Sequence, residues 1–374
     1  DDGWFGKRSN DYTGLGDWVA NKERLPFGIK GLADRIEEMG MKFGLWFEPE
    51  MVNKDSDLYR AHPDWILHAP QRASCHGRNQ YVLDFSRKEV VDCIYDMMYK
   101  ILSESKISYI KWDMNRSITE CYSVALPADR QGEVFHRYIL GVYDLYERLT
   151  TAFPQILFES CASGGGRFDP GMLYYAPQGW ISDDTDAAER VRIQYGTSMC
   201  YPISSMGSHV SVVPNHQLNR ITSLHTRANV AYFGTFGYEL DLNKLTDEEI
   251  AEVKAQIIFM KEYRELIQFG NFYRLKSPFD GNETVWMTVS EDKRKALVFW
   301  YRERNVVNAE FTRVRLQGLD PDLIYKNEYN GTENYGDELM NLGLLTTDVT
   351  AGEPTNEDLP CTDYESRIYV LTAE

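Results

Sequence analysis

The 374-residue chain lacks the patterns that mark several common classes of protein. It has no run of about 18 apolar residues, so no membrane-spanning helix is expected. Its formal net charge of −17 argues against nucleic acid or an anionic membrane surface as a partner. No signal peptide, repeat or low-complexity linker is visible. These absences favour a globular protein whose ligand is neutral or cationic.

Paired cysteine motifs are also missing. Six cysteines occur at irregular spacing, and none forms a CxxC pair. In a chain of this length, that pattern predicts free thiols in a reducing compartment, and hence a cytoplasmic location. The six residues are Cys75, Cys93, Cys121, Cys161, Cys200 and Cys361.

Several catalytic signatures are absent as well. Histidine is scarce, with seven residues, and no G-x-S-x-G elbow occurs, so a Ser-His-Asp site is not expected. The sequence contains neither an HExxH motif nor a phosphate-binding loop. Zinc-protease and nucleotide-hydrolysing chemistries are therefore disfavoured.

What the chain does contain, from about residue 26 to 270, is a regular alternation of short apolar segments with segments of helical spacing. The expected strands are 41–50, 107–113, 155–161, 178–186, 201–211 and 230–241. The expected helices are 87–105, 132–153, about 188–200, about 215–229 and 246–269, the last capped by Thr246. This alternation predicts parallel strands, and two further strands upstream would close a (β/α)8 TIM barrel. An open doubly wound sheet is the alternative, although no Gly-rich turn follows the first strand.

The pattern of apolar and polar residues changes after about residue 271. Segments such as "ETVWMTVSEDKRKALVFWYRER" and "SRIYVLTAE" alternate apolar and polar residues, with Gly, Asn and Asp between them. This pattern is typical of antiparallel strands. We therefore expect a small antiparallel β-sandwich at 271–374, after a barrel at 1–270.

Carboxylates recur where the expected parallel strands end, which is the functional face of a barrel. Asp113, Glu159 and Asp183 follow three successive strands, and Glu48 and Glu50 follow an earlier one. Two chemistries fit. Glycoside hydrolysis needs a pair of carboxylates, and magnesium-assisted enolisation needs acidic ligands with a lysine base. The eight Trp and 24 Tyr suit the binding of sugar rings, although on composition alone an aromatic-rich core is the better explanation.

Five long motifs resemble the catalytic barrel of the α-galactosidases of glycoside hydrolase family 36. They are "DDGWFGKR", "GLWFEPEMV", "YIKWDMNR", "ESCASGGGRFDPGMLYYAPQGWISDDTDA" and "PISSMGSHVS". They follow the family's order from residue 1 to about 211. The resemblance implies a retaining, metal-free exo-hydrolase that needs no cofactor and removes terminal α-1,6-linked galactose from oligosaccharides such as melibiose and raffinose.

The resemblance also implies roles for single residues. Asp113 matches the family's nucleophile and Asp183 its acid/base, while Asp1 and Asp2 match the pair that holds the 4- and 6-hydroxyls of galactose. Trp46 would wall the pocket, and Arg78 and Lys111 would bind ring hydroxyls. Cys161 and Gly164 would lie near the 2-hydroxyl. We expect Asn115 and Arg116 to brace the strand end.

The sequence also leaves three other functions open. A raffinose-synthase-like galactosyltransferase would use the same groups, a magnesium-dependent enolase-type barrel enzyme would use the carboxylates as ligands, and a sugar-binding protein would need no catalytic pair. The family fold has an N-terminal β-sandwich and earlier barrel strands, so the resemblance implies that the chain is N-terminally truncated. It also implies a homo-oligomer, as a tetramer.

Overall fold

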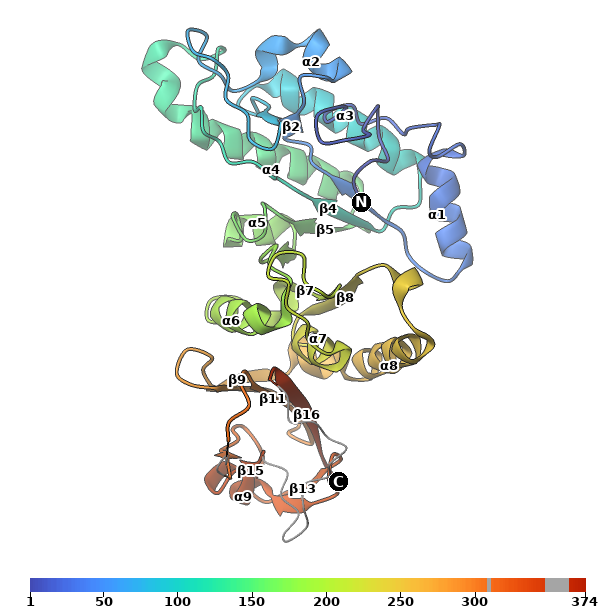
Figure 1. Ribbon diagram of the computed structural model, residues 1–374. Coiled ribbons are helices and arrows are strands. Elements are labelled where there is room, and N and C mark those ends of the chain that lie inside the picture. The colour runs from blue at the N-terminus through green and yellow to red at the C-terminus, as the bar shows by residue number, and fades with distance from the viewer. Residues whose placement is uncertain (308–310, 347–362) are drawn as a thin grey trace. The chain divides into compact units, whose positions relative to one another are not determined.

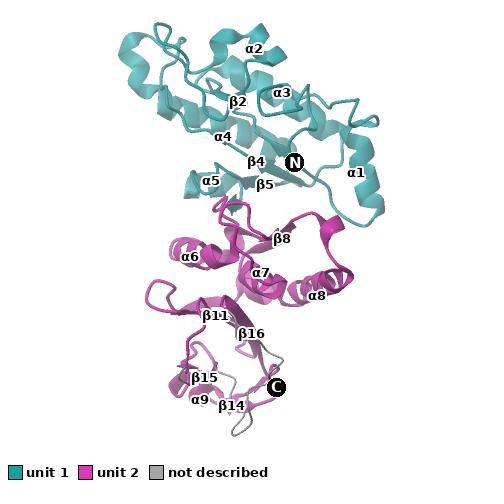
Figure 2. Ribbon diagram, in the orientation of Figure 1, with its two compact units in different colours: residues 1–180 teal, residues 181–374 magenta. Residues whose placement is uncertain are grey.

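The computed structural model describes residues 1–307, 311–346 and 363–374. The chain divides into two compact units, residues 1–180 (unit 1) and 181–374 (unit 2) (Figure 2). The expected domain boundary at 270/271 lies inside unit 2 and stays a prediction. Within the described ranges, no helix is long and apolar enough to cross a membrane.

Unit 1 is built on four parallel strands that lie side by side in chain order (Figure 1). They are β1 (Gly44–Phe47), β4 (Tyr109–Trp112), β5 (Leu157–Ser160) and β6 (Gln178–Trp180). Each lies within a segment expected to be a strand. Because parallel strands end at the same edge of a sheet, the residues that follow them are brought together.

Helices and a short ribbon surround this sheet. The helices α3 (Lys88–Glu104) and α4 (Val134–Ala152) match the expected ones, and 3₁₀ helix η2 (Ala128–Glu133) leads into α4. The elements that the sequence did not indicate are α1 (Gly28–Glu38), α2 (Asp57–Ala61), η1 (Pro63–Trp65), α5 (Pro170–Tyr175), and the antiparallel pair β2 (Met51–Val52) and β3 (Tyr81–Val82).

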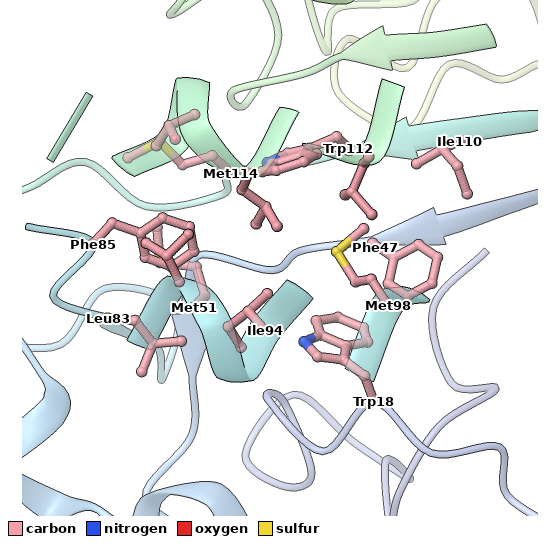
Figure 3. Packing of buried hydrophobic residues seen from close by; sticks show 14 of the residues in the cluster. Trp18, Phe47, Met51, Leu83, Phe85, Ile94, Met98, Ile110, Trp112 and Met114 are labelled. Atoms are coloured by element: carbon pink, nitrogen blue, oxygen red, sulfur yellow. The ribbon is translucent and has the colours of Figure 1, made fainter. Parts of the chain in front are cut away.

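The core of unit 1 lies between the sheet and the helices, where Trp112, Ile110 and Phe47 pack with Ile94 and Met98 of α3 (Figure 3). The indole of Trp112 also stacks on the ring of Tyr146 at 3.9 Å. Burying a side chain of this size stabilises the fold by roughly 2–3 kcal/mol. Because side chains alternate along a strand, this packing turns the intervening Lys111 and the following Asp113 to the opposite face.

Unit 2 begins with barrel-type elements. The strands β7 (Met206–Ser211) and β8 (Thr235–Glu239) are parallel, and they alternate with α6 (Ala187–Ser198), η3 (Ile203–Ser205), α7 (Leu224–Ala231), η4 (Leu242–Lys244) and α8 (Asp247–Phe269). The expected cap of α8 is confirmed, since Thr246 and Glu249 form a capping box. Helix α7 begins later than expected. Asn215 instead accepts hydrogen bonds from the amides of residues 217 and 218, and Ser223 caps the helix.

The remainder of unit 2 is the expected antiparallel β-domain. Its six-stranded sheet has the order β14-β13-β16-β11-β10-β9. These strands are β9 (Asn271–Lys276), β10 (Glu283–Val289), β11 (Lys295–Arg302), β13 (Ile324–Asn327), β14 (Glu333–Tyr335) and β16 (Glu365–Ala373). A two-stranded ribbon, β12 (Arg313–Val314) with β15 (Leu344–Leu345), and helix α9 (Gly336–Asn341) share its apolar core.

Candidate active site

The carboxylate of Asp113 lies buried immediately after β4 and is held by three donors. Its Oδ2 accepts hydrogen bonds from Trp46 Nε1 at 3.2 Å and Asn115 Nδ2 at 2.6 Å. Its Oδ1 accepts one from the backbone N–H of Met114 at 2.8 Å. Together these bonds fix the orientation of the carboxylate.

Lys111 lies on the same face, two residues earlier. Its ammonium nitrogen is 3.1 Å from Glu159 Oε1 and 4.4 Å from the ring centre of Trp180. The second oxygen of Glu159 accepts from Gln178 Nε2 at 2.9 Å and from the Tyr109 hydroxyl. Lys111 therefore stands at the sheet edge as a cation whose charge a buried carboxylate balances.

Cys161 follows β5 and is buried against Asp113. Its backbone N–H donates to the Trp112 carbonyl at 2.8 Å, which continues the strand pairing. Burial first, and then the negative charge of Asp113, raise the pKa of the Cys161 thiol well above its ordinary value. The thiol is therefore neutral near pH 7.

Gly164 turns the chain directly after this cysteine. Its φ of +84° lies in the left-handed region, which a side chain disfavours. Its carbonyl accepts from the backbone N–H of Ala162 at 2.9 Å. This tight turn holds the backbone of the β5–α5 loop at the edge of the sheet.

Arg78 and Asn115 form the rim of the site. The Arg78 guanidinium donates to Asn115 Oδ1 at 2.7 Å, and Asn115 in turn contacts Asp113. Arg116 points elsewhere, because its guanidinium donates to the Cys75 carbonyl and the Thr119 hydroxyl. Arg116 thus braces the strand end as expected, whereas Asn115 also touches the carboxylate itself.

The opening residues of the chain lie in the same unit. The Asp2 carboxylate accepts from Arg8 Nε at 3.0 Å and Nη2 at 2.9 Å, while Asp1 stays exposed. The indole N–H of Trp4 donates to the Trp46 carbonyl at 2.9 Å, which ties this segment to the end of β1. Arg8, which the sequence did not single out, thus positions Asp2.

Asp183 lies in unit 2, on the loop after β6, with an exposed side chain. Asp186, three residues later, has a structural role, since it caps α6 and pairs with Arg220. Arg190 donates to the Ser182 carbonyl at 3.1 Å and holds the loop. Unit 1 thus collects Asp113, Lys111 and Cys161 at one sheet edge, while the separation of the Asp113 and Asp183 carboxyl groups stays a prediction.

A cavity of about 330 Å³ opens beside Asn115. Apolar side chains of α4, among them Phe135 and Ile139, line one part of it, and Ser163 and Gly166 of the β5–α5 loop line another. Among the residues that the structure describes, no three His, Cys, Asp or Glu side chains gather in a geometry that would hold a metal ion.

The family model described as Melibiase matches residues 1–270, and the one described as the glycosyl hydrolase family 36 C-terminal domain matches residues 283–371. The chain belongs to glycoside hydrolase family 36. Residues 1–270 thus correspond to the barrel of this family, and the antiparallel sheet of unit 2 corresponds to the family's C-terminal domain.

Two curated members of family 36 illustrate the likeness. The chain is 55% identical over 344 residues to alpha-galactosidase AgaA of Geobacillus stearothermophilus, and 53% identical over 344 residues to alpha-galactosidase Mel36A of Lactobacillus acidophilus. Each alignment covers 92% of this chain and 47% of the relative. The chain therefore spans about half the length of the curated relatives it matches.

Solved structures of family 36 agree. The crystal structure of AgaA superposes with a TM-score of 0.94 at 52% identity, covering all of this chain and 50% of that one. The galactosidase domain of an alpha-galactosidase–sucrose kinase gives a TM-score of 0.92 at 47% identity, covering all of this chain and 49% of that one. Variants of AgaA have been solved with raffinose and with stachyose. This likeness confirms the expected barrel and β-domain.

Proposed function

We propose that the protein is a retaining exo-α-galactosidase that removes terminal α-1,6-linked galactose from melibiose, raffinose and related oligosaccharides. The observation that carries the proposal is the Asp113 carboxylate, buried at the edge of a parallel sheet and oriented by three donors. The names of the relatives, and their complexes with raffinose and stachyose, support the substrate class.

In the proposed mechanism, Asp113 attacks the anomeric carbon while Asp183 donates a proton to the glycosidic oxygen. The products are a covalent galactosyl-enzyme and a free alcohol. Asp183 then takes a proton from water, which attacks the same carbon and releases galactose with its original α configuration. This sequence needs carboxyl groups about 5–5.5 Å apart, so we expect that separation between Asp113 and Asp183.

The remaining predicted residues would hold the sugar. We propose that Asp2, oriented by Arg8, and Asp1 bind the 4- and 6-hydroxyls, and that Trp46 walls the pocket while its N–H orients Asp113. Lys111 and Arg78 would donate to ring hydroxyls. The neutral thiol of Cys161 and the Gly164 turn would lie near the 2-hydroxyl, where the cysteine side chain leaves little room for an acetamido group.

We also make proposals for the domains, the oligomeric state and the location of the protein. We propose the barrel at 1–270 and the β-domain at 271–374, a homotetramer, and a reducing, cytoplasmic location. The location is supported by the described cysteines Cys75, Cys93, Cys121, Cys161 and Cys200, which are free thiols. Cys361 lies outside the described residues. Light scattering of the purified protein would test the tetramer.

The deciding experiment follows the hydrolysis of 4-nitrophenyl α-galactoside by ¹H NMR, with and without a chelator. We expect the α-anomer of galactose as the first product and no loss of rate on chelation. β-Galactose as the first product would contradict a retaining mechanism. Loss of activity in chelator would favour the metal-dependent alternative, and transfer to sugar acceptors in preference to water would favour the galactosyltransferase.

A further inference from the structure

Glu48 is a fully buried carboxyl group to which the proposed mechanism assigns no role. It follows β1 directly, beside the site. Its Oε1 accepts a hydrogen bond from the backbone N–H of Asn115 at 2.5 Å, and its Oε2 accepts one from Gln80 Nε2 at 2.9 Å. A buried carboxyl group with two specific partners next to a reactive carboxylate calls for a physical explanation.

Asn115 connects Glu48 to Asp113. Its backbone N–H is bound to Glu48, while its side-chain amide donates to Asp113 Oδ2 at 2.6 Å. The amide oxygen of Asn115 accepts from Arg78 Nη1 at 2.7 Å. Because backbone and side chain are both held, the amide has little freedom to rotate away from the carboxylate.

The charge on Glu48 is set by its neighbours. Burial, and then the negative charge of Asp113, raise the pKa of Glu48 to about 8, against the lowering effects of the Asn115 N–H and of Arg78. The charged groups that face Glu48 are therefore Asp113, after β4, and Arg78, in the loop before β3. Near pH 7, Glu48 is mainly neutral, so Asp113 does not face a second buried anion.

The neutral acid has a partner for its proton. In the described part of the chain, the side-chain oxygen of Gln80 is buried and has no hydrogen-bond partner. The oxygen and nitrogen of an amide exchange places when the group turns by half a rotation. In that orientation, the Gln80 oxygen accepts the acid proton of Glu48, while Glu48 still accepts from the Asn115 N–H.

We propose that Glu48 and Asn115 are positioning residues for Asp113, in which Glu48 fixes the backbone of Asn115 and the Asn115 amide orients the carboxylate. The inference rests on the proposed function, in which Asp113 is the nucleophile. Neither residue needs to touch the reacting atoms. The pair matters because displacing a nucleophile by about 1 Å costs on the order of 100-fold in rate.

The test compares kcat and KM of Glu48→Ala, Glu48→Gln and Asn115→Ala on 4-nitrophenyl α-galactoside, in the protein at its natural length. We expect Glu48→Ala and Asn115→Ala to lose about 100-fold in kcat, with KM changed less than about threefold. Glu48→Gln keeps an acceptor for Asn115 and gains a donor for Gln80. It should therefore stay within about threefold of the parent at pH 6.

A pH profile separates positioning from a general effect on folding. The parent should lose kcat as the pH rises through about 8, because Glu48 then becomes an anion beside Asp113. Glu48→Gln should lack that fall. Asp84→Ala is the matched control, because Asp84 is equally buried and its carboxylate accepts hydrogen bonds from the hydroxyls of Ser86 and Ser123. Its kcat per folded molecule should match the parent.

The outcomes are distinct. Parent-like kcat in both Glu48→Ala and Asn115→Ala would overturn the inference while leaving the proposed function intact. Glu48→Gln as impaired as Glu48→Ala would overturn it too, since the hydrogen bonds would then not be the cause. A parent that hydrolyses no α-galactoside would overturn the proposed function, and the inference with it.

Discussion

Glu48 and Glu50 lie two residues apart after the same strand, and both are fully buried, yet they are stabilised in opposite ways. Glu50 pairs with the Arg167 guanidinium through two bonds of 2.8 Å each and also accepts from the Trp112 and Tyr138 side chains. Glu48 has two amide donors and a second carboxylate nearby. Burial is common to both, so the difference lies in their partners: a guanidinium pairs with Glu50, whereas a second carboxylate faces Glu48.

The two glutamates therefore have different roles: the contacts of Glu50 stabilise the fold, and those of Glu48 lie beside the proposed nucleophile. The Glu50 cluster joins the ends of β1 and β4 to α4 and the β5–α5 loop through a compensated ion pair. The Glu48 cluster lies against Asp113, where a second anion would disturb the nucleophile. Glu48, next to the reactive carboxylate, is thus a neutral acid, whereas Glu50, two residues farther along the chain, is held in an ion pair with Arg167.

The largest expected effect comes from removing the carboxylate that Glu48 faces. Asp113→Ala should lower kcat on 4-nitrophenyl α-galactoside by about four orders of magnitude or more, because no covalent intermediate forms. Azide should restore part of the turnover and yield β-galactosyl azide, detectable by ¹H NMR. Asp84→Ala serves as the control, and a parent-like rate in Asp113→Ala would refute the assignment.

Breaking the Glu50 ion pair should act on stability. Arg167→Met leaves the Glu50 charge buried without its guanidinium, so we expect a loss of roughly 3–5 kcal/mol in the free energy of unfolding. Urea titration followed by tryptophan fluorescence measures the loss. The double variant Arg167→Met/Glu50→Gln should recover a large part of it. A single variant as stable as the parent would show that the Arg167–Glu50 ion pair does not stabilise the fold.

Replacing Glu48 should change how stability depends on pH. The pKa of Glu48 is raised from 4.5 to about 8 in the folded state, so the folded protein binds the proton more tightly than the unfolded chain. The free energy of unfolding should therefore fall between about pH 4.5 and 8, by on the order of a few kcal/mol. Glu48→Gln should remove this slope, as urea titrations across the range would show. An unchanged slope would mean that Glu48 is ionised when buried.

The smallest effect is expected from Arg78, an exposed residue whose positive charge lowers the pKa of Glu48. Arg78→Gln should move the alkaline fall of kcat upward by less than about one pH unit. It should also raise KM several-fold if Arg78 binds a sugar hydroxyl. Lys54→Gln provides the control, because it removes another exposed cation, one that donates to the Ser74 hydroxyl. If kcat in Arg78→Gln fell at a lower pH than in the parent, Arg78 would not be lowering the pKa of Glu48.

Periodicity predicted the parts of the fold that repeat. The strands around Ile110 and Phe158 follow from apolar runs, and α3, α4 and α8 follow from helical spacing. Period-two alternation in β4 also predicted that Lys111 and Asp113 share a face. Apart from the 11-residue helix α1, the elements that sequence reasoning missed are short, such as α5 and the β2–β3 pair, because two to six residues carry too little periodicity.

The partners of the predicted residues were harder to foresee. Arg8 and Arg167 come from loops, and their contacts with Asp2 and Glu50 depend on how distant segments meet. Asn115 was expected to brace the strand end, but its amide also reaches Asp113. A signal did exist for the glutamates, since two acidic residues in "WFEPEM" directly follow a buried strand. The sequence could not show which of them pairs with an arginine.

Covalent labelling would show directly whether Asp113 is the nucleophile. The protein would be treated with 5-fluoro-α-galactosyl fluoride, digested, and analysed by mass spectrometry of its peptides. We expect time-dependent inactivation and one covalent fluorogalactosyl group on Asp113, absent from Asp113→Ala. A label on Glu48, Glu159 or any other carboxylate, with Asp113 unmodified, would contradict this expectation.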